Sequence, residues 1–179
     1  TTSFGYMNPT IKVAKRFPNV KFEHATGYKR AKNVGTYFER AYEARYLTGV
    51  LAGHMTKSDI IGYVAAFPIP EVVRGIDAFT LGLRSVKPNA KVKVIMVNSW
   101  YDPGKEHEAA TSLIQQGADV ISQHTDSPGV VQAAEAAGVY SIGYHSDMSK
   151  FGPHAFLTAA VHNWNEFYVK RVQQVLDGT

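Results

Sequence analysis

The stretch KVKVIMVNSWYDPGKEHEAATSLIQQGADVISQHTDSP, residues 91–128, decides the fold class because it holds one complete repeat of an α/β sheet. Its apolar, β-branched run at 92–97 is typical of a strand buried on both faces. Asp102 then caps a helix predicted over 103–117, which has a proline at its first position and a glycine at its end. The next strand is predicted at 118–122.

The same alternation continues on both sides of this stretch, which predicts an α/β protein with parallel sheets. A polar link at 56–59 is a point where the chain could pass between two lobes. Further helices are expected at 8–18, 34–52, 70–83, 127–138 and 165–178, and further strands at 20–24, 60–66, 139–143 and 155–160.

Composition excludes several classes of function. The chain has 179 residues, 45% apolar and 19% charged, with a net charge of +4, which is an ordinary globular balance. Lys and Arg look scattered, so we expect no nucleic-acid partner. The absence of cysteine excludes a thiol nucleophile and a thiolate metal site. There is no apolar run long enough for a membrane span, and no signal peptide opens the chain. The sequence also has no glycine-rich phosphate loop, so we expect no cofactor.

The loops that follow the predicted strands are rich in aromatic rings and hydrogen-bonding side chains. Because the carboxyl ends of parallel strands meet at one edge of a sheet, we expect these loops to line one crevice. Flat apolar walls with a few polar groups suit a small planar molecule such as a purine base. The candidate ligand-binding residues are Phe4, Gly5, Tyr6, Phe67, Trp100, Asp102, His124, Thr125, Asp126, Tyr144, His145 and Asp147.

Structural roles compete with this interpretation at several positions. Asp102, Asp126 and Ser127 lie where helix caps belong, and Trp100 or Phe67 could be packing residues. The histidines lack the close helical spacing of a metal site, and no Gly-x-Ser-x-Gly elbow indicates a nucleophile, so the sequence indicates neither a metal site nor an enzyme.

Four ordered motifs resemble one family. They are IGYVAAFPIPEV at 61–72, NSWYDPGKE at 98–106, QHTDSP at 123–128 and GYHSDM at 143–148, and they look like the BMP (basic membrane protein) family of substrate-binding proteins of ABC importers, related to purine nucleoside receptors. The resemblance implies a type I periplasmic-binding-protein fold with two doubly wound lobes and parallel sheets.

The family is longer at both ends, so the resemblance implies an incomplete first lobe and a complete second lobe. Residues 1–56 would be part of lobe I, 57–159 lobe II, and 160–179 the return to lobe I. The opening residues resemble the tail of a strand, which predicts a fragment or a processed chain, and exposed sheet edges would then favour pairing into a homodimer.

The resemblance also implies a role. The protein would capture a purine base or nucleoside between the lobes, in the periplasm or on the outer face of the cell membrane, with or without a lipid anchor, and deliver it to an ABC permease. Trp100 would stack on the purine, and Phe4 and Tyr6 would approach it from lobe I. His145 and His162 replace an aspartate and a lysine of the nucleoside receptors, which favours a free base such as adenine.

Two other classes remain open from the sequence. An α/β enzyme that processes nucleosides would need an acidic metal site or a phosphate site. A ligand-sensing domain of a regulator or chemoreceptor shares the architecture by analogy only.

Overall fold

The computed structural model describes residues 1–178 and divides into two compact units, Thr1–Arg40 and Ala41–Thr179. Every strand pair within the two sheets is parallel and helices alternate with strands, so the predicted α/β class with parallel sheets is confirmed. The compact units divide after Arg40, and the lobe boundary expected after residue 56 stays a prediction. Residues 160–179 are grouped with the second unit, so their return to a first lobe stays a prediction, and Thr179 lies outside the described residues.

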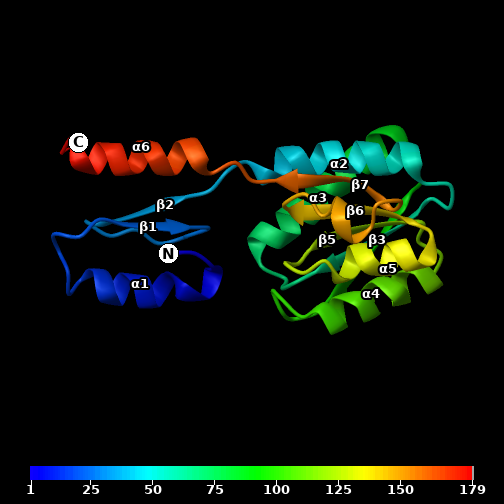
Figure 1. Ribbon diagram of the computed structural model, residues 1–179, viewed down its shortest axis with the longest axis horizontal. Helices are drawn as coiled ribbons and strands as arrows, with labels where there is room; N and C mark the ends of the chain where they lie inside the picture. Colours follow the sequence, from blue (N-terminus) through cyan, green and yellow to red (C-terminus); the bar gives the residue numbers. More distant parts are fainter. Residues whose placement is uncertain (179) are drawn as a thin grey trace. The chain divides into compact units, whose positions relative to one another are not determined.

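The first unit is a two-stranded parallel sheet covered by one helix (Figure 1). Its small core contains the buried side chains of Met7, Ala14 and Val34. The elements are η1 (Phe4–Tyr6), α1 (Met7–Ala14), β1 (Phe22–Ala25) and β2 (Val34–Tyr37).

One expected helix, at 34–52, was wrong over its first part. Val34–Tyr37 forms strand β2, which pairs in parallel with β1, and the helix α2 begins only at Ala41 and ends at Met55. The apolar spacing runs on from strand to helix without a glycine or proline to separate them, so periodicity alone merged the two elements.

The second unit is built on a five-stranded parallel sheet with the order β4-β3-β5-β6-β7. Asp102 caps α4 by accepting a hydrogen bond from the Lys105 backbone N–H, and Gly138 ends α5 with a φ of 68°, as the sequence predicts. The strands are β3 (Ile60–Ala65), β4 (Lys91–Met96), β5 (Val120–His124), β6 (Tyr140–His145) and β7 (Phe156–Val161), and the other elements are α3 (Pro70–Val86), α4 (Pro103–Gln115), α5 (Gly129–Ala137), η2 (Ser149–Phe151) and α6 (Asn165–Leu176).

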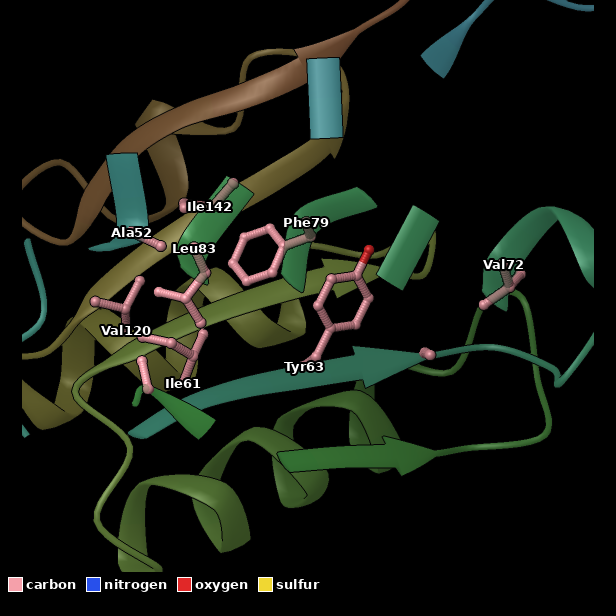
Figure 2. Packing of buried hydrophobic residues seen from close by; sticks show 10 residues of the cluster. Ala52, Ile61, Tyr63, Val72, Phe79, Leu83, Val120 and Ile142 are labelled. Carbon is pink, nitrogen blue, oxygen red and sulfur yellow. The ribbon is translucent and has the colours of Figure 1, made fainter. Parts of the chain in front are cut away.

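Each face of this sheet carries its own apolar core. Strand β3 alternates, sending Tyr63 toward α2 and α3 and Val64 toward α4 and α5. Figure 2 shows the ring of Tyr63 beside that of Phe79 from α3, and the two centroids lie 5.4 Å apart. The carboxyl ends of the strands are therefore supported by a packed apolar core on each face of the sheet.

Strand β4 was expected to be buried on both faces, and this was wrong. It is the edge strand of the sheet, and Val94 is 39% exposed. A continuous apolar run does not show which strands lie beside it, so the sequence could not distinguish an edge strand from a central strand.

Among residues 1–178, the helices lack the length and apolar character needed to cross a membrane.

Helices α2 and α3 approach each other through two glycines. A β-carbon on Gly49 would lie 2.0 Å from the carbonyl oxygen of Phe79, and one on Gly82 would lie 2.0 Å from that of Tyr46. The backbones of α2 and α3 are therefore in direct contact.

We expect Gly82→Ala to destabilise the protein by about 2–3 kcal/mol, because the added methyl must push two helix backbones apart. Urea denaturation measures this free energy of unfolding. Gly104→Ala is the matched control, since its β-carbon would have only an ordinary contact 3.6 Å away, and it should be neutral or slightly stabilising. Equal losses in both variants would contradict the close helix contact.

Asp119 joins the start of β5 to the link before β3. Its carboxylate accepts hydrogen bonds from the Thr56 hydroxyl (2.6 Å) and from the backbone N–H groups of Lys57 (2.7 Å) and Ser58 (2.9 Å). Burial pushes the pKa of Asp119 up, but these hydrogen bonds outweigh it and lower that pKa below its ordinary value. The link at 56–59 is therefore anchored to the start of β5.

A carboxylate whose pKa is lowered by folding stabilises the protein above its unfolded pKa of about 4 and loses that effect as the pH falls through its folded pKa. Asp119→Asn should therefore cost about 1–2 kcal/mol at pH 7, and the difference from the wild type should shrink below about pH 4. Thermal unfolding at several pH values tests this, and a difference that stays constant down to pH 2 would refute it.

Candidate functional site

A row of aromatic rings lies along the edge where the five parallel strands of the second unit end. Ring centroids are 5.3 Å apart for Phe67 and Trp100, 6.3 Å for Trp100 and His124, and 4.4 Å for His124 and Tyr144. The row continues from Tyr144 to His145 at 3.7 Å and from His145 to His162 at 4.7 Å. These six residues, the ring row, come from or just after the ends of β3, β4, β5, β6 and β7.

A chain of hydrogen bonds runs beside the ring row. The Nε2 of His145 lies 2.9 Å from an oxygen of Asp126, and its Nδ1 lies 2.6 Å from the Nε2 of His162. A carboxylate only accepts, so His145 donates from Nε2. In the neutral imidazole, Nδ1 then accepts from His162, which fixes the orientation of both rings.

The backbone of His145 supports a functional reading. Its φ is 67°, in the left-handed region that non-glycine residues rarely occupy. The side chains of His145 and Asp126 are each 39% exposed, so the strained position presents a hydrogen-bonded pair to solvent. Such strain concentrates at binding sites, where the surrounding structure holds it.

His124 and Tyr144 lie beneath this exposed layer and are buried. Burial, the Arg45 guanidinium and the neighbouring His145 and His162 lower the pKa of His124 to about 2, so this imidazole is neutral at neutral pH. Its Nε2 lies 3.9 Å from an oxygen of Glu71, but with a neutral ring this contact is not an ion pair.

Arg45 on α2 is a residue of this layer that the sequence analysis missed. It is 1% exposed, its guanidinium lies 3.9 Å from the centroid of Tyr144, and its Nη1 donates to the Gln123 carbonyl over 2.8 Å. In the sequence Arg45 is one of many cations on helices, and no pattern marks it as buried.

The sequence analysis named His162 only as the residue that replaces a lysine of the nucleoside receptors. Its hydrogen bond with His145 depends on the pairing of β6 with β7.

The loops that carry Trp100 and Asp126 are fastened together by Glu106, which the sequence analysis also missed. This buried carboxylate accepts from the Asp102 backbone N–H (3.0 Å) and from the Ser127 hydroxyl (2.6 Å). The backbone N–H of Asp126 also donates to the Trp100 carbonyl over 2.9 Å. The two loops are therefore one connected piece.

Two of the predicted site residues, Asp102 and Asp147, make local hydrogen bonds and are not part of the ring row. The Asp102 carboxylate accepts from the Lys105 N–H (3.1 Å), and this hydrogen bond lowers the pKa of Asp102. Asp147 accepts from the Ser149 N–H (2.8 Å), which lowers its pKa in the same way. A ligand role for these two stays a prediction that the contacts do not favour. Thr125 is fully buried and its hydroxyl has no hydrogen-bond partner among the described residues, so its ligand role stays a prediction.

Phe4, Gly5 and Tyr6 lie in the first unit. Phe4 stacks on Tyr28 with 5.0 Å between centroids, and Tyr6 is largely exposed. Their part in ligand binding stays a prediction.

The chemistry available at the ring row is recognition of a flat molecule. Phe67 and Trp100 offer ring faces, and the oxygen of Asp126 that lies outside its hydrogen bond with His145 offers an acceptor. Within residues 1–178, no group of three or more His, Asp or Glu side chains is arranged to hold a metal ion. A surface hollow of about 520 Å³ also lies along α6 between Asn165 and Gln174, but the residues that line it belong to a single helix and include no ring.

Known proteins resemble this chain over its whole length. A family model described as ABC transporter substrate-binding protein PnrA-like (Bmp) matches residues 1–179. The chain is 57% identical over its whole length to a purine-binding protein of Brucella abortus and 49% identical over 99% of its length to a putative ABC transporter glucose-binding protein of Haloferax volcanii. It spans about half the length of these relatives, 51% and 46% respectively.

Solved structures share the fold. An ABC transporter solute-binding protein of Aeropyrum pernix has a TM-score of 0.86 at 21% identity, with 98% of this chain and 53% of that chain covered. A transcriptional activator of the comK gene from Bacillus halodurans has a TM-score of 0.84 at 23% identity, with 99% and 62% covered. The type I periplasmic-binding-protein fold expected from the sequence is confirmed by these likenesses.

The matched model covers every residue of the chain, and it describes a family of binding proteins, not enzymes, as the sequence analysis expected. The chain belongs to the Bmp family of PnrA-like ABC transporter substrate-binding proteins.

Proposed function

We propose that this protein captures a purine base, adenine or a close relative, outside the cytoplasm and delivers it to an ABC permease. The observation that carries the proposal is the ring row, in which the Phe67 and Trp100 rings adjoin the hydrogen-bonded chain of Asp126, His145 and His162. The Brucella relative, at 57% identity, is named as purine-binding, which supports the same ligand class here.

The hydrogen bonds that join Asp126, His145 and His162 favour a base over a nucleoside as the ligand. The oxygen of Asp126 that faces His145 is already engaged by its Nε2, and His145 is engaged on both ring nitrogens. Neither group is arranged as a free carboxylate and ammonium that could hold the two hydroxyls of a ribose. The other oxygen of Asp126 lies outside its hydrogen bond with His145, and it can accept from an N–H donor on the edge of a purine.

Binding would work by selecting one conformation. A ligand that contacts both lobes only when they are closed shifts the population toward the closed form, and the closed form would dock on the permease. A role as the sensing domain of a regulator rests on the shared fold alone and is not favoured by any contact in the site.

Calorimetric titration with adenine, adenosine, guanosine and glucose tests the proposal. We expect adenine to bind more tightly than adenosine or guanosine, because His145 and His162 supply no ammonium to hold the hydroxyls of a ribose. Glucose should bind least, because a sugar gains less than a planar base from stacking on an aromatic ring. Adenosine binding much more tightly than adenine would overturn the free-base assignment, and tight glucose binding would overturn the purine class.

Trp100→Ala should weaken adenine binding by about 5- to 150-fold, because stacking of a base on an aromatic ring contributes about 1–3 kcal/mol. The matched control is Tyr101→Ala, since Tyr101 is 64% exposed and is not part of the ring row. Calorimetry of both variants with adenine measures the effect. An unchanged affinity in Trp100→Ala would place the ligand away from the ring row.

A further inference from the structure

Positive charge is concentrated in the first unit. Residues 1–40 carry eight Lys and Arg against two Glu, a net charge of +6, whereas residues 41–179 carry eleven against thirteen acidic residues, a net charge of −2. The scattered distribution expected from the sequence was therefore wrong, because the count over the whole chain hides an asymmetry between its parts.

Part of this positive charge lies at one end of the first unit, on segments that Asn33 holds together. Its side-chain N–H₂ donates to the carbonyls of Ala14, Phe17 and Val20 over 2.9–3.1 Å, which satisfies the end of α1 and the turn after it. The backbone of Asn33 also accepts from the Phe22 N–H over 2.8 Å. The turn and the start of both strands are thus fixed together, and we call residues 15–21 with Lys32 and Asn33 the basic tip.

Four cations lie on the basic tip: Lys15, Arg16, Lys21 and Lys32. All four are exposed, and across the described part of the chain none of their side chains has a hydrogen-bond or ion-pair partner. Two apolar side chains, Phe17 at 49% and Val20 at 48% exposure, lie on the turn between them.

Helix capping explains only part of this arrangement. Lys15 and Arg16 follow the end of α1, where cations complement the helix dipole. Lys21 and Lys32 lie at strand starts, where no helix end needs them. Nor does a dipole explain two exposed apolar side chains on a turn that is held rigid by three hydrogen bonds.

We propose that the basic tip is a contact surface for an anionic phospholipid membrane. An apolar pair between flexible cations matches the two parts of a lipid interface, with Phe17 and Val20 entering the headgroup boundary while the cations meet phosphate groups. An acidic protein surface would complement the cations equally well, but it would leave the apolar pair without a role. The contact is independent of the purine site.

Co-sedimentation of the intact chain with vesicles tests the proposal, using phosphatidylcholine with about one third phosphatidylglycerol and phosphatidylcholine alone. In about 0.1 M salt, where the screening length is about 10 Å, we expect binding to the anionic vesicles only. Lys21→Glu with Lys32→Glu should weaken it by on the order of 10- to 100-fold, since each cation near an anionic surface contributes about 1 kcal/mol. Phe17→Ser with Val20→Ser should also weaken it, by at least about 5-fold.

The matched control is Lys57→Glu with Lys91→Glu, which makes the same change of charge at two exposed lysines of the second unit and should bind as the wild type does. Adenine affinity should be unchanged in all variants, which separates this test from that of the purine site. Equal binding to neutral vesicles, or an equal loss in the control, would overturn the proposal. An effect of the charge variant without one of the apolar variant would also overturn it, because the attraction would then be electrostatic alone and Phe17 and Val20 would not enter the lipid.

Discussion

The shared direction of the five strands in the second unit is the constraint on which the candidate site depends. Each strand pair is hydrogen-bonded in parallel register, so every strand delivers its carboxyl end to the same edge. Phe67, Trp100, Asp126 and His145 are separated by up to 78 positions in sequence and meet only because of this direction. The glycine contact between α2 and α3 and the two apolar cores hold the sheet, and the sheet positions the rings.

Local signals predicted much of the fold. Asp102 with Pro103 marked the start of a helix, and Gly138 marked the end of another, because capping depends on neighbouring residues only. The merged helix at 34–52 failed for the opposite reason: β2 is a strand because β1 lies beside it, and that neighbour is not visible in the local pattern. Strand β4 failed in the same way, since its edge position is a property of the sheet.

The candidate site also has a part that local sequence signals predicted and a part that depends on neighbours in space. The loops after the strands were found from their composition, and the rings at 67, 100, 124, 144 and 145 do lie together. Arg45 and Glu106 could not be found, because buried charges that support other residues look like ordinary surface charges in a sequence. Two of the histidines that adjoin Tyr144 differ in their surroundings, which the sequence does not show: His124 is enclosed and neutral, while His145 is partly open to water and bonded to a carboxylate.

Glu106 has a consequence for how ligand preference can change. By tying the start of α4 to the turn before α5, it makes the segments around Trp100 and Asp126 a single template, so a substitution in one segment is transmitted to the other. Phe67 and His162 lie on segments outside this tie. Selectivity can therefore diverge most freely at these two outer positions, while the centre of the template keeps its shape.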